Sequence, residues 1–261
     1  MSVPHSAMSH PTHSGLASIV LPTYNEAGNI VDLIDAIDRE VKHPHEIIVV
    51  DDNSPDGTSR LVSELIQRGS IEGLRLETRM KDRGLTKSIA RGIELSRGDV
   101  VCWMDCDFSH PPATLAKLIG HVMGGVDFAI ASRYVPGGQY KMGLKWFGAD
   151  ESALGVLLSR MINWFIHIAL DSRLHDYTSG FIAVRRDVLS SLLPLQGDYG
   201  EYFMDLMYRA LKASHTFYEM PFVSPPRRSG QSKTGTTFRE LFKRGLPYIR
   251  MIPKLRGMKG R

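Results

Sequence analysis

The chain has 261 residues, of which 43% are hydrophobic and 23% are charged, a composition typical of a folded domain with a sizeable core. Its net charge of +4 is unevenly distributed, because residues 227–261 hold eleven Lys and Arg residues and only one acid, Glu240. A basic tail favours an anionic partner, such as a phosphorylated substrate or an anionic membrane. The chain lacks aromatic-rich RNA-binding and zinc-finger patterns, so we expect no nucleic-acid partner.

Three parts are expected along the chain. Residues 1–15 are rich in Ser, His and Pro without the apolar core of a signal peptide, which predicts a disordered tail. Residues 16–236 are expected to form one α/β domain, and residues 237–261 a basic tail that forms an amphipathic C-terminal helix. Cys102 and Cys106 lie four positions apart on what we expect to be one strand, roughly 13 Å at their Cα atoms, so we predict free, buried thiols.

Apolar runs typical of buried strands alternate with helical patterns along the chain. The predicted strands are 18–22, 46–50, 74–78, 99–104, 126–131 and 216–223. The predicted helices are 30–41, one around 61–66, 86–96, 112–122, about 152–170, 186–193 and 202–212. This order predicts a parallel sheet with helices on both faces. The long loop 135–148, with Lys141, Lys145, Trp146 and Phe147, is a candidate lid or binding loop.

Polar and acidic residues follow three of the predicted strands. They are Tyr24 and Glu26, then Asp51, Asp52 and Asp56, then Asp105 and Asp107. Because the carboxyl ends of parallel strands meet at one edge, we expect these side chains to share a crevice. The chain has neither a dinucleotide-binding glycine motif nor a phosphate-binding loop. The Asp105 and Asp107 pair is either an ordinary acidic loop or a site where a divalent cation bridges the acids to a phosphate.

Six segments in order resemble the motifs of family 2 glycosyltransferases with the GT-A fold, closest to the dolichol-phosphate mannosyltransferase branch. The segments are 21–26, 51–58, 105–107, 132–134, 178–181, and Arg227 with Ser232 and Lys233. The resemblance covers residues 17–235. It implies a Rossmann-like, mostly parallel central sheet flanked by helices. It also implies an inverting, metal-dependent transfer of a hexose from a nucleotide diphosphate sugar to a polyprenyl or dolichyl phosphate. The first candidate for the hexose is mannose, and for the donor GDP-mannose.

The resemblance also implies roles for particular residues. The implied donor-binding residues are Pro22, Tyr24, Glu26, Asp52, Lys81, Gly84 and Asp105. The implied ligands of Mg²⁺ or Mn²⁺ are Asp105, Asp107 and Ser109, and the implied acceptor-phosphate residues are Arg133, Arg227, Ser232 and Lys233. Asp105, Asp107 and Arg133 are the implied catalytic residues.

The acceptor is argued partly from chemistry. A phosphate monoester, with a second pKa of about 6, is largely dianionic at neutral pH and needs cations rather than a general base. The chain departs from the family at Ser109, where Gln is usual, at Ile182, where Arg is usual, and at 148–153, where basic residues are usual. Two alternatives therefore stay open. One is a UDP-sugar transferase with a hydroxyl acceptor and Asp176 or Asp205 as base, and the other is a non-catalytic, membrane-associated subunit that binds nucleotide sugars.

Two segments suggest contact with a membrane. The apolar stretch 154–170 is interrupted by polar residues and is shorter than the ~20 residues that cross a bilayer, so it is either a buried helix or an interfacial one. The basic tail either lies on an anionic membrane, docks a small membrane protein, or packs back on the domain. We expect a peripheral protein on the cytoplasmic face of a membrane. Asp176 either orients the acceptor or acts as a base, or it is a helix-capping or loop acid. His110 is expected to be a structural neighbour of the acid pair.

Overall fold

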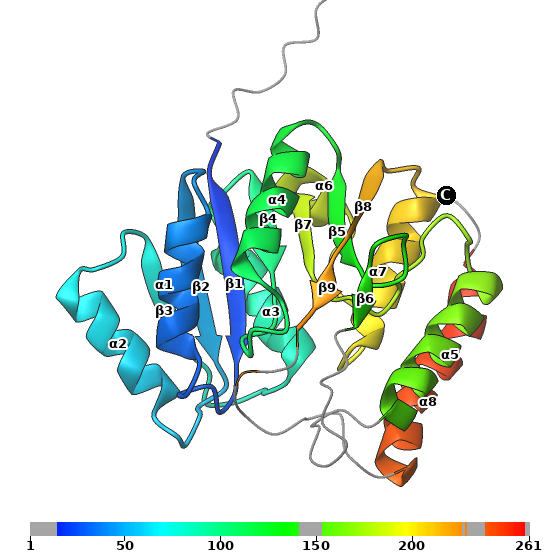
Figure 1. Cartoon of the computed structure of the whole chain (residues 1–261), viewed down its shortest axis with the longest axis horizontal. Coiled ribbons are helices and arrows are strands. Elements are labelled where there is room, and N and C mark those ends of the chain that lie inside the picture. Colours follow the sequence, from blue (N-terminus) through cyan, green and yellow to red (C-terminus); the bar gives the residue numbers. More distant parts are fainter. Residues whose placement is uncertain (1–14, 141–152, 226–227, 229–237, 259–261) are drawn as a thin grey trace, which may run out of the picture.

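The structure, a computed structural model, describes residues 15–140, 153–225, 228 and 238–258 (Figure 1). A seven-stranded sheet with the order β3-β2-β1-β4-β7-β5-β8 forms its centre. The strands are β1 (Ala17–Thr23), β2 (His45–Asp51), β3 (Leu74–Thr78), β4 (Val100–Trp103), β5 (Phe128–Ser132), β7 (Ile182–Arg185) and β8 (Phe217–Pro221). The short strands β6 (Gln139–Tyr140) and β9 (Val223–Ser224) form a separate pair. The mostly parallel sheet that the sequence predicts is confirmed.

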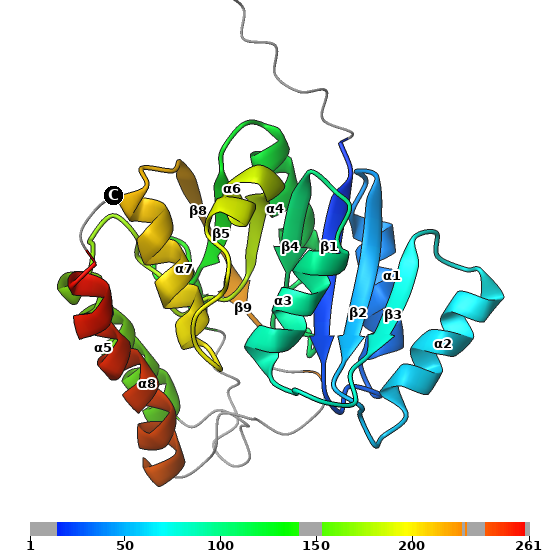
Figure 2. The same ribbon diagram turned by 180° about the vertical axis from the view of Figure 1, so that it is seen from behind.

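Helices cover both faces of the sheet (Figures 1 and 2). They are α1 (Ile30–Glu40), α2 (Thr58–Arg68), α3 (Leu85–Leu95), α4 (Pro112–Met123), α5 (Ala153–Ala169), α6 (Arg186–Ser191), α7 (Glu201–Lys212) and α8 (Phe238–Arg256). Successive residues of β1 point to opposite faces, so Ile19 and Leu21 pack in one apolar core while Val20 packs in the other. Helices α1 and α4 pack on the first core, and α3 and α7 on the second.

One glycine sets the approach of α3 to the sheet. A Cβ atom added at Gly92 would lie 2.1 Å from the Cγ1 atom of Val20 in β1. No side chain fits at that separation, so the absence of one lets α3 lie directly on the central strands.

Strand β7 is the main element that the sequence analysis missed. It pairs antiparallel with both β4 and β5 and separates them in the sheet. Because β7 reverses direction relative to each neighbour, β4 and β5 themselves run parallel, and their carboxyl ends reach the same edge. Ile182, the position where the family usually has Arg, begins this strand and is fully buried. Its side chain therefore packs in the core.

Smaller predictions also need correction. Strand β4 ends at Trp103, so Cys106 lies beyond it and the two cysteines do not share one strand. Both are nevertheless free and buried, as predicted. The predicted strand 216–223 is divided into β8 and β9. The N-terminal tail 1–14 and the part of the candidate lid that holds Lys141, Lys145, Trp146 and Phe147 lie outside the described residues.

The C-terminal helix α8 packs back on the domain. Ile252 and Leu255 are buried in the second core, and α8 contacts both α7 and α5. Figures 1 and 2 show α5 and α8 side by side at the β8 end of the molecule. Within the described ranges, no helix is long and apolar enough to cross a membrane.

Candidate active site

The loops that follow β1 and β2 are joined by hydrogen bonds to side chains. The backbone N–H of Asn25 donates to the Ser54 hydroxyl at 2.9 Å, and that of Glu26 donates to the Thr58 hydroxyl at 3.0 Å. The N–H of Ala27 donates to Asp56 at 2.9 Å. The first loop, which holds residues predicted to bind the sugar donor, thus lies directly against the second loop.

The residues in and before the first loop that are predicted to bind the sugar donor differ in their exposure to solvent. The ring of Tyr24 is 40% exposed and therefore accessible to a ligand. Glu26 is largely buried and accepts a hydrogen bond from the Asn29 side chain at 2.9 Å, at the start of α1. Pro22 lies in β1, and its carbonyl accepts a contact from the Cys106 thiol at 3.6 Å. This contact links the first loop to the Asp105–Asp107 segment.

Asp52 is held by donors from three segments. Its Oδ1 atom accepts hydrogen bonds from Arg79 at 3.0 Å and from the Ser88 hydroxyl at 2.8 Å. Its Oδ2 atom accepts a hydrogen bond from the backbone N–H of Gly84 at 2.7 Å. Gly84, which is also predicted to bind the sugar donor, is therefore in direct contact with Asp52. Lys81, also predicted, is exposed in the same loop. Arg79 was not predicted as a site residue, because it belongs to no local motif, although its position just after β3 was a usable signal.

Asp51 and Asp56 hold the same loops together. Asp51 accepts the Thr23 hydroxyl at 2.8 Å and is fully buried. Asp56 accepts the backbone N–H of Thr58 at 3.0 Å, at the start of α2. Burial acts to raise the pKa of Asp56, but the hydrogen bonds from Thr58 and Ala27 together outweigh it, so the carboxyl pKa lies below its usual value. These two acids therefore stabilise the loops.

Asp105 follows β4 and is oriented by His110. The Asp105 side chain is 51% exposed, while the His110 side chain is almost fully buried. The backbone N–H of Asp105 donates to Nδ1 of His110 at 3.0 Å, so Nδ1 is the acceptor and a neutral ring carries its proton on Nε2. Nε2 lies 4.0 Å from the Asp105 carboxylate. The ring stacks on Phe181 with centroids 4.4 Å apart, which fits the structural role expected for His110.

Asp107 is buried and its carboxylate is held by Ser109. Its Oδ1 atom accepts the Ser109 hydroxyl at 2.6 Å and the Ser109 N–H at 3.0 Å. The carbonyl of Asp107 accepts the N–H of Arg228 at 3.1 Å. The Arg228 guanidinium lies over the Phe108 ring, 5.3 Å from its centroid, and pairs with Asp32 at 2.8 Å. Arg228, which follows β9 in the chain, therefore lies against the Asp105–Asp107 segment.

The chemistry of this segment fits a divalent cation whose coordination is completed by a substrate. In the part of the chain that the structure describes, no three His, Cys, Asp or Glu side chains gather into a metal cage. Asp105 and Asp107 provide carboxylate oxygens, and Mg²⁺ commonly binds through one or two carboxylates together with substrate phosphates and water. Ser109 donates its hydroxyl to Asp107, so its observed contact orients one of the two acids.

Arg133 follows β5 and is fixed by Asp176. Asp176 has no exposed surface and accepts the backbone N–H, Nε and Nη2 of Arg133 at 2.9 to 3.0 Å. It also accepts the backbone N–H and hydroxyl of Thr178 at 3.0 and 3.1 Å. A carboxylate with these five donors is poorly suited to act as a general base. Of the roles left open by the sequence, that of a structural loop acid fits this geometry.

The other candidate base is also engaged. Asp205 on α7 forms an ion pair with Arg209 at 2.6 Å and is almost fully buried.

Of the residues predicted to bind the acceptor phosphate, the structure describes Arg133 alone, since Arg227, Ser232 and Lys233 lie outside the described residues.

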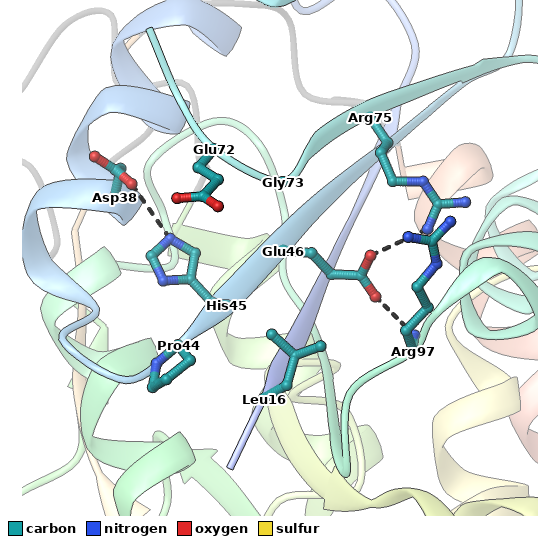
Figure 3. A pocket seen from close by; sticks show the side chains of 9 residues that line it. All are labelled: Leu16, Asp38, Pro44, His45, Glu46, Glu72, Gly73, Arg75 and Arg97. Atoms are coloured by element: carbon teal, nitrogen blue, oxygen red, sulfur yellow. Dashed lines mark hydrogen bonds and ion pairs between the residues drawn. The ribbon is translucent and has the colours of Figure 1, made fainter. Parts of the chain in front are cut away.

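A cavity of about 480 Å³ lies elsewhere in the molecule (Figure 3). It is lined by residues at the amino ends of the strands, among them Leu16 before β1, His45 at the start of β2 and Gly73 before β3. Glu46 in its wall accepts hydrogen bonds from Arg75 and from the backbone of Arg97. Its position at the opposite end of the strands from Asp52 and Asp105 separates it from the candidate active site.

The fold resembles those of nucleotide-sugar enzymes. The glucosyl-3-phosphoglycerate synthase of Mycobacterium tuberculosis, solved with Mn²⁺, UDP-glucose and phosphoglyceric acid, matches with a TM-score of 0.69 at 19% identity. The match covers 94% of this chain and 81% of that one. The same enzyme solved with Mg²⁺ and UDP matches with a TM-score of 0.66 at 20% identity. These matches show a shared GT-A fold.

Sequence relatives give the family. The polyprenol monophosphomannose synthase of Mycolicibacterium smegmatis is 34% identical over 228 residues, covering 85% of this chain and 82% of that protein. The dolichol-phosphate mannosyltransferase of Pyrococcus furiosus is 34% identical over 248 residues, covering 93% of this chain. This chain spans 64% of the length of the Pyrococcus protein. The family model for glycosyl transferase family 2 matches residues 18–193. The chain belongs to glycosyl transferase family 2.

Proposed function

We propose that this protein transfers a hexose, with mannose the first candidate, from a nucleoside diphosphate sugar to a polyprenyl phosphate, inverting the anomeric carbon. GDP-mannose is the expected donor, and the names of the two sequence relatives support mannose as the sugar. The observation that carries the proposal is that Asp52, Asp105 and Arg133 follow β2, β4 and β5, which run in one direction. The acids proposed to bind the sugar donor and the oriented guanidinium of Arg133 therefore lie at the same edge of the sheet.

In the proposed reaction, the acceptor phosphate oxygen attacks the anomeric carbon from the face opposite the leaving group. A bond forms between that oxygen and the carbon, and the bond from the carbon to the nucleoside diphosphate breaks, which inverts the configuration. A Mg²⁺ or Mn²⁺ ion, when bound by Asp105 and Asp107, supplies positive charge that offsets the charge on the departing diphosphate. Tyr24, Glu26 and Asp52 are proposed to bind the nucleoside.

The proposed role of Arg133 is to hold the acceptor phosphate. Its guanidinium is already oriented by Asp176, so little side-chain freedom is lost when a phosphate oxygen binds. The involvement of Asp176 and Asp205 in ion pairs favours an acceptor that needs no base over a hydroxyl acceptor. Arg227, Ser232 and Lys233 are proposed to complete the phosphate contacts. Because the acceptor is a lipid, we also propose a peripheral location on the cytoplasmic face of a membrane.

One incubation series tests the proposed function. The full chain is mixed with Mn²⁺, labelled GDP-mannose, GDP-glucose or UDP-glucose, and either a polyprenyl phosphate or the matching free polyprenol. Label in the lipid phosphate with GDP-mannose, and none with the polyprenol, is the expected result. Label only on a hydroxyl acceptor would support the UDP-sugar alternative, and donor binding without turnover would support a non-catalytic subunit. A chelator control reports the requirement for a cation.

A further inference from the structure

Side chains from two other elements hold the short segment 175–177, which contains Asp176. One is Glu219 in β8, the strand that pairs with β5 at the end of the sheet. The other is Asn163 in α5. Together, Glu219 and Asn163 make hydrogen bonds with four backbone groups of the segment. The backbone on both sides of Asp176 is therefore fixed by residues that are distant in the fold from the strand connections it joins.

The Glu219 carboxylate accepts three hydrogen bonds from this segment. Its Oε2 atom accepts the backbone N–H of His175 and the Nδ1–H of the His175 ring, both at 2.8 Å. Because a carboxylate only accepts, Nδ1 carries a ring proton. The Oε1 atom of Glu219 accepts the backbone N–H of Asp176 at 3.0 Å. Both oxygens of Glu219 are thus bound to Asp176 or to the residue before it.

Asn163 contacts the same segment from α5. Its side-chain nitrogen donates to the carbonyl of His175 at 2.5 Å, and its side-chain oxygen accepts the N–H of Tyr177 at 2.9 Å. Asn163 is 4% exposed whereas the adjacent Trp164 is 63% exposed, so Asn163 lies on the side of α5 that packs on the protein. Both ends of one amide group therefore bind the backbone on the two sides of Asp176.

The burial of Glu219 makes these hydrogen bonds strong. Its side chain is only 6% exposed, and a carboxylate is costly to bury unless hydrogen bonds replace its water. Hydrogen bonds to an ionised group are also stronger than those between neutral groups. The Asp176 backbone consequently has little freedom to shift. The Asp176 carboxylate, which holds the Nε and Nη2 atoms of Arg133, is fixed with it.

We propose that Glu219 and Asn163 are positioning residues for Arg133 and act on it through Asp176. The proposal rests on the proposed function, in which Arg133 holds the acceptor phosphate. A displacement of about 1 Å in a group that positions a substrate is enough to slow a reaction markedly. In this assignment, Glu219 and Asn163 affect turnover without contacting the sugar donor or the acceptor.

The first test follows the Arg133 guanidinium itself. Hydrogen exchange of its Nε proton is measured by nuclear magnetic resonance in the full chain, and Arg133→Lys identifies the signal. Glu219→Gln keeps the size of the side chain but leaves one oxygen to accept three hydrogen bonds. Exchange of the Nε proton should become at least about tenfold faster in Glu219→Gln. Unchanged exchange would overturn the proposal, whatever reaction the protein catalyses.

Glu46→Gln is the matched control. The Glu46 side chain is also 6% exposed, and it likewise accepts a backbone N–H, from Arg97, and pairs with a basic side chain, Arg75. Glu46 lies in β2 beside the cavity at the amino ends of the strands (Figure 3). Glu46→Gln should leave the exchange of the Arg133 Nε proton unchanged. Equal acceleration in both variants would refute the proposal, because it would reflect a general loss of stability.

Kinetics test the consequence for the reaction. Glu219→Gln should lower the turnover number with a polyprenyl phosphate by about tenfold and leave the KM for GDP-mannose within a factor of about two. Combined with Asp176→Asn, Glu219→Gln should lower turnover further by less than about twofold, since both changes disturb the same contact. A further tenfold loss in the double variant would show that Glu219 acts independently of Asp176, which is contrary to the proposal.

Asn163→Asp tests the same segment from the other side and provides a second variant if Glu219→Gln does not fold. It keeps an oxygen for the N–H of Tyr177 but places another against the carbonyl of His175. Nε exchange should again become faster and turnover should again fall. If neither quantity changes in Asn163→Asp, the positioning role is wrong.

The two measurements separate this proposal from the proposed function. Normal transfer to the polyprenyl phosphate by Glu219→Gln would contradict the positioning role alone. If Nε exchange responds to Glu219→Gln but not to Glu46→Gln, while the original chain transfers no hexose to a polyprenyl phosphate, the positioning of Arg133 is supported and the proposed function is wrong.

Discussion

Asp176 accepts three hydrogen bonds from Arg133, one from its backbone and two from its guanidinium, while remaining fully buried. The two residues lie 43 positions apart, after β5 and before β7. The ion pair thus joins two neighbouring strand connections at the edge of the sheet where β4 also ends. This geometry makes Asp176 a positioning residue for Arg133.

Asp176→Asn should lower the turnover number by about a hundredfold, because a misplaced Arg133 holds the acceptor phosphate less accurately. Breaking a buried ion pair should also lower the free energy of unfolding by about 3 kcal/mol. The affinity for the nucleotide should stay within a factor of about two. Steady-state kinetics and nucleotide titration on the same preparation measure these quantities.

The control for that change is Asp205→Asn. It breaks a second buried Asp–Arg pair, with Arg209 on α7, and should cause a comparable loss of stability. Turnover per folded molecule should remain close to that of the original chain. If Asp205→Asn abolishes transfer while Asp176→Asn does not, Asp205 is the better candidate for a base and the hydroxyl-acceptor alternative gains support.

Asp107→Ala should abolish transfer, with a loss of at least about a thousandfold, because the cation that offsets the leaving-group charge loses a ligand. Ser109→Ala should cost less, since it removes only the hydroxyl that orients Asp107 and leaves both carboxylates in place. Product formation and Mn²⁺ titration in the presence of GDP measure the two effects.

Asp127→Asn is the matched control for the acidic site, since Asp127 precedes β5 at the opposite end of that strand and pairs with Arg185. It should leave cation binding and turnover unchanged. Near-normal turnover in Asp107→Ala would contradict the assignment of Asp107 as a cation ligand.

Much of this fold could be predicted because its signals are local. The strands ending at Thr23, Asp51 and Trp103 show continuous apolar runs, and each is followed by a polar loop. Strand β7 was not predicted, because its short apolar run directly follows the recognised motif 178–181. Its antiparallel place between β4 and β5 depends on pairing across the whole domain, which no local pattern encodes.

In the candidate site, too, some features could be predicted from the sequence and others could not. The positions of Asp52, Asp105 and Asp107 follow from their placement after strands. The pairing of Asp52 with Arg79 and of Arg133 with Asp176 could not be predicted, because only the folded chain brings these residues into contact. The exposure of one side of α5 was likewise undecided, because a pattern of apolar residues does not say which of them a neighbouring helix covers.

Arg79→Ala should weaken nucleotide binding by about tenfold, because it removes the charged donor that holds Asp52 at 3.0 Å. Arg91→Ala is the control, since Arg91 forms a comparable ion pair with Glu77 on the surface of the molecule. Titration with GDP and with UDP compares the variants. If Arg79→Ala and Arg91→Ala bind nucleotide equally, Asp52 does not depend on Arg79 for its role.

Asp56 should give the protein a defined sensitivity to acid. Although burial alone raises the pKa of Asp56, its hydrogen bonds with Thr58 and Ala27 hold that pKa below the usual 3.8. The ionised carboxylate therefore contributes stability that is fully present above the pKa of the unfolded chain and is lost as the pH falls through the lower folded pKa. In Asp56→Asn this contribution is absent, so the difference in unfolding free energy between the two proteins should shrink as the solution is acidified from neutral pH. Urea unfolding at a series of pH values measures the difference, and a gap that stays constant across the series would show that the Asp56 carboxylate does not carry this dependence.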